Sequence, residues 1–291
     1  MVGPVRTGKS TFIKRFMDLL VIPNITDTFE RDRAIDELPQ SASGKTIMTT
    51  EPKFIPNEAA NITIDGNIKL KVRLVDCVGY LVEGALGHLE NDVPRMVDTP
   101  WFEEKIPFGE AAEIGTKKVI TEHSTIGLVV TTDGSITDIA RSEYEEAEER
   151  VIIEMKNTGK PFAVLLNCID PSQEETLAIK ERLREKYGVP VLPVNCSSMS
   201  QEDINDIMQT VLYEFPICEI GINIPSWMVS LDYDEALKAS LTDAIRDSFE
   251  AASKVRHISA SVEALANYPF IKKAVVSSIN AGSGCSLIEL Q

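Results

Sequence analysis

The most restrictive feature of this 291-residue chain is the stretch Gly3–Ser10, which reads GPVRTGKS and fits the Walker A pattern G-x-x-x-x-G-K-[ST]. Its glycines allow backbone N–H groups to curl around phosphate oxygens, and the apolar spacing of Thr11–Leu20 predicts a helix N-terminus behind them. Lys9 supplies an ammonium for the β and γ phosphates, and Ser10 a hydroxyl for Mg²⁺. The candidate phosphate-binding residues are Gly3, Pro4, Val5, Arg6, Thr7, Gly8, Lys9, Ser10 and Thr11.

The overall charge limits the partners that this chain can have. It carries 29 basic and 45 acidic residues, a net charge of −16, so general electrostatic attraction to nucleic acid or anionic lipid is excluded. Any anionic ligand must be held by local groups against this field. The five cysteines are odd in number and include no CxxC pair, which indicates reduced thiols of a cytosolic protein rather than disulfides or a zinc site.

A second motif follows an apolar strand. Val72–Val75 ends in Asp76, and Gly79 lies three residues further on, giving D-x-x-G. An acidic residue at the end of a buried strand is placed to reach Mg²⁺, and Gly79 leaves its backbone N–H open to a γ-phosphate. Between the two motifs, Thr49 and Thr50 lie in a stretch of no clear periodicity, where a hydroxyl can sense the metal and the γ-phosphate.

Two later strand ends correspond to the base-recognition loops of regulatory GTPases. The first reads Asn167-Cys168-Ile169-Asp170, where those proteins normally have N-K-x-D, and the second begins at Asn195. Asp170 can accept two hydrogen bonds from guanine, which favours guanine. Cys168 replaces the lysine whose stem stacks on the base, which disfavours it. These residues leave the base open, with Asn167 and Asp170 as the candidate base contacts.

The residues available for catalysis predict slow hydrolysis. Proteins of this type often have Gln or His after D-x-x-G to orient water, and here Tyr80 and Leu81 follow. We therefore expect turnover near the intrinsic rates of about 10⁻⁴ to 10⁻² s⁻¹. Arg6 either stabilises phosphate charge or points to solvent, and the second reading is favoured.

The order of elements predicts an α/β fold of the P-loop NTPase type, with three layers and a mostly parallel central sheet. A hairpin is expected from Asn61–Ile64 and Lys69–Val75, and strands then alternate with helices as far as Pro216. We place a P-loop domain at 1–217 and a smaller α/β domain at 218–291. Long loops are expected at 23–55 and 79–118. The remaining expected segments are a strand at 125–131, a helix at 142–156, a strand at 162–166, a helix at 172–187 with Ser172 as its N-cap and Gly188 as its stop, a strand at 189–194, a helix at 201–215, an extended segment at 218–229, a helix at 233–255, a further segment at 259–267 and a β-branched run at 273–279.

Four stretches together resemble one known family. They are GPVRTGKSTFIKRFMDLLVIPNI, TIMTTEPKFIPNEA, VRLVDCVGY and INIPSWMVSLD. They are similar to stage IV sporulation protein A, a family of spore-coat morphogenetic ATPases with an N-terminal domain related to translation-factor GTPases. The resemblance covers essentially all 291 residues, including stretches that generic P-loop proteins do not share.

The resemblance implies an ATPase that uses Mg²⁺ with ATP and polymerises irreversibly into the basement layer of the spore coat, on the mother-cell side of the forespore surface. Lys9 then matches the Walker A lysine, Asp76 the Walker B aspartate, and Thr49 with Thr50 the threonine pair that supports hydrolysis. Ser10, Asp76, Thr49 and Thr50 become the metal candidates. The implied partners are further copies of itself, other coat proteins and, through a C-terminal region not in this sequence, a small amphipathic membrane peptide.

Two other functions stay open beside the morphogenetic ATPase. One is a regulatory GTPase of the translation-factor class, and the other is a structural protein that binds nucleotide without hydrolysing it. Only Met1 and Val2 precede Gly3, whereas a central strand needs about five or six residues. We therefore expect the chain to be a fragment lacking both termini, with most of the first strand missing, and to be less stable and poorer at hydrolysis than a longer version.

Overall fold

The chain forms two compact units, residues Met1–Ile207 (unit 1) and Met208–Gln291 (unit 2). The computed structural model describes residues 1–39, 52–64, 68–87, 89–90, 93–229, 232, 236–280 and 283–291. The boundary between the units falls inside helix α6 (Gln201–Tyr213), whereas the sequence places the domain boundary at 217.

Unit 1 contains a parallel three-stranded sheet in the order β7-β8-β9, formed by β7 (Gly127–Thr132), β8 (Phe162–Asn167) and β9 (Val191–Val194). The predicted hairpin is confirmed: β1 (Lys53–Ile64) pairs antiparallel with β2 (Ile68–Asp76). The chain start lies between the two sheets, because the Met1 nitrogen donates to the Val75 carbonyl at 2.8 Å and Val2 bridges Val129 in parallel.

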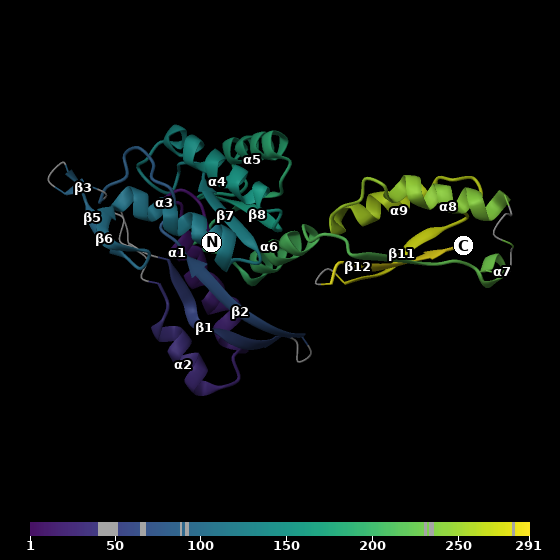
Figure 1. Ribbon diagram of the computed structural model, residues 1–291, viewed down its shortest axis with the longest axis horizontal. Coiled ribbons are helices and arrows are strands. Elements are labelled where there is room, and N and C mark those ends of the chain that lie inside the picture. The colour runs from purple at the N-terminus through teal and green to yellow at the C-terminus, as the bar shows by residue number, and fades with distance from the viewer. Residues whose placement is uncertain are drawn as a thin grey trace. The chain divides into compact units, whose positions relative to one another are not determined.

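Helices cover this sheet through apolar residues at helical spacing (Figure 1). On α4 (Glu145–Asn157), Val151, Ile152 and Met155 are buried and join Val129 and Val164 of the sheet in one core. The other helices of unit 1 are α1 (Lys9–Phe16), α2 (Thr28–Asp36), α3 (Phe108–Lys118) and α5 (Glu174–Tyr187), with shorter helical turns η1 (Met17–Val21), η2 (Ile22–Asn24), η3 (Val119–His123) and η4 (Arg141–Tyr144).

Both long loops expected from the sequence were wrong in part. The 23–55 segment contains α2, whose N-cap Asp27 accepts a hydrogen bond from the Glu30 nitrogen, and the first residues of β1. The 79–118 segment ends in α3. It also forms two short antiparallel pairs, of β3 (Leu89–Glu90) with β4 (Val93–Pro94) and of β5 (Met96–Thr99) with β6 (Phe102–Pro107).

The predicted cap of α5 was also wrong. The helix begins after Gln173, which makes no side-chain capping bond, and the Ser172 hydroxyl instead donates to Asp170 at 2.6 Å. The predicted stop is confirmed, since Gly188 ends the helix with φ 63°. A left-handed residue at this position satisfies the last carbonyls of a helix.

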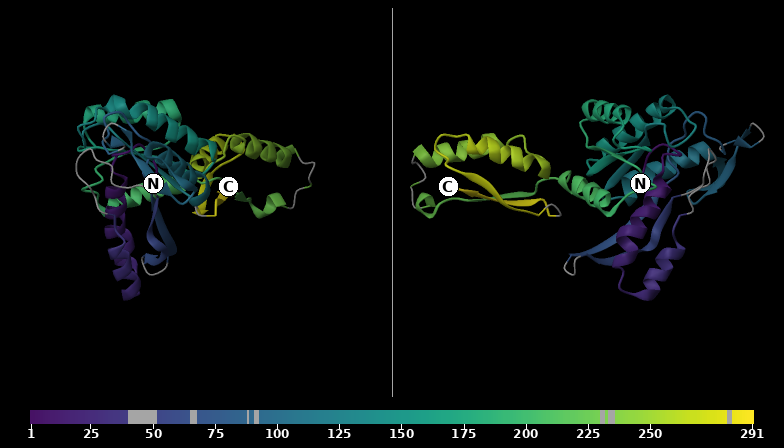
Figure 2. Two further views of the ribbon diagram at one scale, coloured as in Figure 1. Left: turned by 60° about the vertical axis from the view of Figure 1, so that its left-hand side comes forward. Right: turned by 180° about the vertical axis from the view of Figure 1, so that it is seen from behind.

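Unit 2 is a smaller α/β unit. Its sheet has the order β10-β12-β11, where β10 (Glu219–Asn223) runs parallel and β11 (Ala274–Asn280) antiparallel to β12 (Cys285–Leu290). Helices α8 (Ala236–Phe249) and α9 (Ile258–Ala266) lie on one side of it in every view (Figures 1 and 2). The prediction of an extended segment at 218–229 is confirmed only for its first half, because α7 (Ser226–Val229) is helical. A short helical turn, η5 (Val255–His257), precedes α9.

A buried carboxylate organises one end of unit 2. Glu214 is 4% exposed, and it receives Lys254 at 2.6 Å and Arg256 at 2.8 Å. Two cations on one carboxylate offset the cost of removing its charge from water. This ion cluster fastens the end of α6 to the segment before α9.

All five cysteines are free, and Cys77, Cys168 and Cys196 are buried. Within the described ranges, no helix combines the length and apolar character needed to cross a bilayer.

Candidate functional site

The Gly3–Ser10 loop is held in a strained path by the strands beside it. Gly3 has φ 144° and Gly8 φ 94°, and Arg6 is left-handed at φ 63°. The loop is anchored where the Val5 nitrogen donates to the Tyr80 carbonyl at 2.9 Å. It then enters α1 directly, with Gly8 as the N-cap, so the first amides of the helix face the loop.

Lys9 lies over this loop. Its side chain is buried, and Nζ donates to the carbonyl oxygens of Pro4 at 2.5 Å and Gly3 at 3.4 Å. Burial lowers the pKa of the Lys9 ammonium, with the nearby Cys77 and Asp76 opposing that shift. A desolvated ammonium held only by carbonyl oxygens is well suited to exchange them for an anion.

Ser10 and Asp76 meet at the end of β2. The Ser10 hydroxyl donates to Asp76 Oδ2 at 2.5 Å, while Asp76 Oδ1 is buried and has no hydrogen-bond partner among the residues that the structure describes. An unpaired buried carboxylate oxygen beside a hydroxyl is a suitable pair of hard ligands for Mg²⁺. Among the described residues no cluster of three His, Cys, Asp or Glu could hold a metal alone, so an ion here would take further oxygens from a bound phosphate or from water.

Gly79 completes the same corner. A Cβ at this position would lie 2.1 Å from the Gly3 oxygen and 2.8 Å from Lys9 Nζ, so only glycine allows this close approach. The Gly79 nitrogen donates to Thr116 Oγ1 on α3 at 3.2 Å. Sequence reasoning missed Thr116, because a single threonine in a glycine-containing helix belongs to no motif.

Tyr80 points away from the loop. Its ring is buried, its hydroxyl donates to Glu154 on α4, and the Arg150 guanidinium stacks on the ring at 4.1 Å. Burial and the hydrogen bond to Glu154 raise the pKa of this phenol. Tyr80 therefore has a structural role, because its side chain joins the segment after β2 to α4.

Asn167 connects the loop to the third strand of the sheet. Its Nδ2 donates to the Thr7 carbonyl at 2.9 Å, and its Oδ1 accepts from the Cys196 nitrogen at 3.1 Å. Gly8 is required beside it, because a Cβ there would lie 2.2 Å from Nδ2. The asparagine expected at the base thus supports the phosphate loop.

Asp170 is placed differently. It is exposed and hydrogen bonds within its own loop, to the Ser172 nitrogen at 2.9 Å and hydroxyl at 2.6 Å. The Ser172 hydroxyl, followed by its backbone N–H, lowers the pKa of this carboxyl. Cys168, at the position of the stacking lysine, is buried with its thiol toward the Val194 carbonyl at 3.6 Å.

The remaining predicted residues lie in the loop and the first turn of α1, or outside the described ranges. Arg6 and Thr11 are half-buried, and burial lowers the pKa of Arg6. Thr7 is buried with its hydroxyl donating to the Pro4 carbonyl at 3.0 Å. Thr49 and Thr50 lie outside the described residues, so their assignment stays a prediction.

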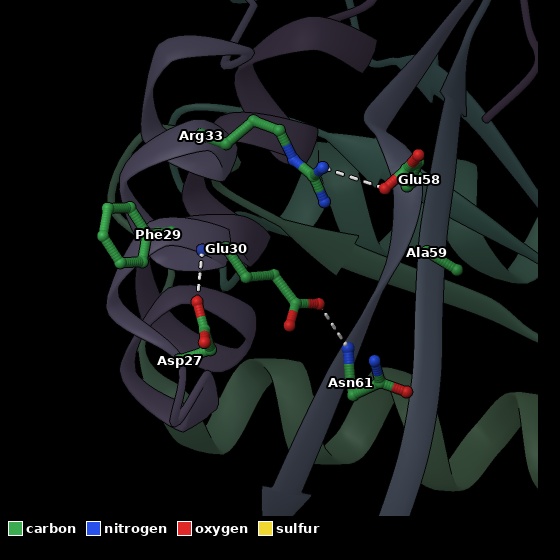
Figure 3. A pocket seen from close by; sticks show the side chains of 7 residues that line it. All are labelled: Asp27, Phe29, Glu30, Arg33, Glu58, Ala59 and Asn61. Carbon is green, nitrogen blue, oxygen red and sulfur yellow. Dashed lines mark hydrogen bonds and ion pairs between the residues drawn. The ribbon is translucent and has the colours of Figure 1, made fainter.

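A separate pocket lies between α2 and β1 (Figure 3). Arg33 pairs with Glu58 at 2.8 Å, and Glu30 accepts from the Asn61 nitrogen at 3.0 Å. These charged groups are engaged with one another across the pocket, which holds α2 against the hairpin. We assign it no ligand.

Comparison with known proteins identifies the family. Residues 1–216 match the ATPase domain of stage IV sporulation protein A, and residues 217–291 match its middle domain. The whole chain is 52% identical to stage IV sporulation protein A of Clostridioides difficile and 50% identical to that of Bacillus subtilis, and it spans 59% of the length of each. The chain therefore belongs to the stage IV sporulation protein A family.

Proposed function

We propose that this chain is an ATP-binding and ATP-hydrolysing part of a sporulation protein, with a P-loop NTPase fold and its site at Gly3–Ser10. One observation carries the proposal: Lys9, the Ser10–Asp76 pair and Gly79 converge on one loop at a helix N-terminus. This is the arrangement that phosphoryl transfer requires of a protein, since its catalysis consists of positioning and charge stabilisation.

Each group has a role that follows from its chemistry. Lys9 exchanges the Pro4 and Gly3 carbonyls for phosphate oxygens, and the loop amides donate to the remaining oxygens. Ser10 and Asp76 hold Mg²⁺, which neutralises charge on the β and γ phosphates when bound. The expected Thr49 and Thr50 pair supports hydrolysis, so replacing both with alanine should leave binding largely intact and remove turnover.

The proposed turnover is slow, about 10⁻⁴ to 10⁻² s⁻¹. Support comes from Tyr80, which follows Gly79 but is committed to Glu154 and Arg150. A slow single event suits assembly better than metabolism. Phosphate release, with Asp76→Ala as the blank, measures this rate and separates the proposal from a protein that binds nucleotide without hydrolysing it.

ATP is the proposed nucleotide. Asp170 is engaged by Ser172, and Cys168 is buried where a stacking lysine would be needed for guanine recognition. The alternative, a regulatory GTPase, is favoured only by the presence of an aspartate at position 170.

The wider role is proposed from the family. On this proposal the protein self-assembles into the static basement layer of the spore coat, in the mother-cell cytoplasm at the forespore surface. Its partners are other coat proteins and a membrane peptide bound by a C-terminal region. Because this chain spans 59% of its relatives, these activities belong to the longer protein.

Nucleotide competition tests the proposal. A fluorescent ATP analogue bound to the purified chain should be displaced by ATP at least about tenfold more effectively than by GTP, the discrimination that about one lost hydrogen-bonded contact provides. Stronger displacement by GTP would establish the GTPase alternative. If neither ATP nor GTP binds to the chain, the assignment of the site is refuted.

A further inference from the structure

The Gly79 amide, which is needed for a γ-phosphate, already has a partner. Its N–H donates to Thr116 Oγ1 at 3.2 Å, and the Thr116 side chain is almost completely buried, with 1% exposed. Water therefore has little access to this hydrogen bond. A ligand that takes the Gly79 amide must displace the threonine hydroxyl.

The position of Gly79 shows which part of a ligand meets this amide. Its Cα faces Lys9, because a Cβ built there would lie 2.8 Å from Nζ and 2.1 Å from the Gly3 oxygen. The Gly79 Cα thus lies beside the ammonium that is proposed to hold the β and γ phosphates, one bond from the amide nitrogen. A diphosphate leaves the outer place empty, so only a triphosphate competes with Thr116.

Helix α3 is also linked to Tyr80, the residue after Gly79, through Arg150. Glu113, one turn before Thr116, pairs with Arg150 at 2.7 Å, and Arg150 stacks on the Tyr80 ring at 4.1 Å. One face of α3 therefore contacts both Gly79 and, through Arg150, Tyr80. These contacts oppose a rotation of the Gly79 amide away from Thr116 and toward a phosphate.

We infer that Thr116 is a specificity-determining residue that competes with the γ-phosphate for the Gly79 amide and so reduces the preference of the site for triphosphate over diphosphate. The inference rests on the proposed nucleotide site. Thr116→Ser provides the matched control, because it keeps the hydroxyl and removes only the methyl group.

The test measures the dissociation constants of ADP and of the β,γ-imido analogue of ATP, both with Mg²⁺, on the full chain. Thr116→Val removes the hydroxyl at nearly constant volume, and should bind the analogue about three- to tenfold tighter with ADP affinity unchanged, since one neutral hydrogen bond no longer competes. Thr116→Ser should retain the wild-type ratio of the two constants. An unchanged ratio in Thr116→Val would overturn the inference.

A second measurement needs no variant. In wild-type chain labelled with ¹⁵N-glycine, the Gly79 amide resonance should move when the imido analogue binds and stay in place with ADP. Equal responses to both nucleotides, or no response to either while both bind, would also overturn it. Failure of the wild type to bind either nucleotide would instead refute the proposed function, so the two failures are distinct.

Discussion

Lys9 is the residue whose replacement should separate binding from folding. Its ammonium is buried against two carbonyl oxygens, and burial lowers its pKa, so the free protein gains little from it. Lys9→Ala should weaken ATP binding by about 100-fold, the size of a lost charged hydrogen-bond partner, and leave the melting temperature near the wild-type value. Titration calorimetry and thermal unfolding measure the two effects.

Lys14 provides the matched control for this substitution. It lies on the same helix but is exposed. Lys14→Ala should bind ATP as the wild type does. Equal losses in the two variants would mean that net charge, rather than the position of Lys9, governs affinity.

At the scale of single residues, the sequence was informative where chemistry is encoded locally. Lys9 and Ser10 are identified by the Gly3–Ser10 motif, and Asp76 by its place at the end of an apolar strand. Their proximity in the folded chain could therefore be predicted. The partner of the Gly79 amide could not, because Thr116 is 37 residues away and reaches Gly79 only through tertiary packing. The same holds for Asn167, whose bond to Thr7 spans 160 residues.

At the scale of elements, Tyr80 joins α4 to the segment after β2, and Arg150 of α4 in turn pairs with Glu113 of α3. Tyr80→Phe removes the hydroxyl that bonds Glu154, whereas Arg150 still reaches Glu154 at 3.4 Å. We expect a loss of about 1 kcal/mol in unfolding free energy, with nucleotide affinity and turnover unchanged. Chemical denaturation and phosphate release measure these quantities.

Tyr213→Phe is the control for that element, because Tyr213 is 37% exposed at the end of α6. It should change stability by less than about 0.5 kcal/mol. A large fall in turnover for Tyr80→Phe at unchanged stability would give Tyr80 a catalytic role and contradict its structural assignment.

The elements that sequence reasoning missed have identifiable causes. Helix α2 buries only Ala34, so it shows no apolar periodicity by which a helix is recognised. Helix α3 contains Gly109 and Gly115, which indicate turns when read locally. In the structure Gly115 is a packing residue, since a Cβ there would lie 3.0 Å from the Trp101 ring and 3.3 Å from Pro52. Strands β7 and β8 were predicted correctly because every residue in them is buried, which leaves a continuous apolar run.

At the scale of the whole molecule, each of the two units has a buried apolar cluster of its own among the described residues. Ile258, Leu265 and Ile288 belong to a buried cluster made entirely of unit 2 residues, whereas the proposed site lies in unit 1. We expect two unfolding transitions by calorimetry. ATP at 100 times its dissociation constant should stabilise the unit that binds it by about 2.7 kcal/mol, raising one transition by about 5–10 °C and leaving the other in place.

Two variants assign these transitions. Lys9→Ala, with its affinity about 100-fold weaker, should reduce the stabilisation by the same ATP concentration from about 2.7 to about 0.4 kcal/mol. Glu214→Gln removes the charge between Lys254 and Arg256 and should lower only the transition that ATP does not move. A single unfolding transition that ATP raises as a whole would contradict the expectation that the two units unfold separately.

The double attachment of Tyr80 has a consequence for how such a site can change over time. Its carbonyl accepts from Val5 in the phosphate loop, and its side chain holds α4 through Glu154 and Arg150. A glutamine in its place would supply a water-holding amide but release α4 from the loop. On the proposed function, a faster enzyme is therefore not one substitution away, and the slowness of the reaction is maintained by the same contacts that keep the fold intact.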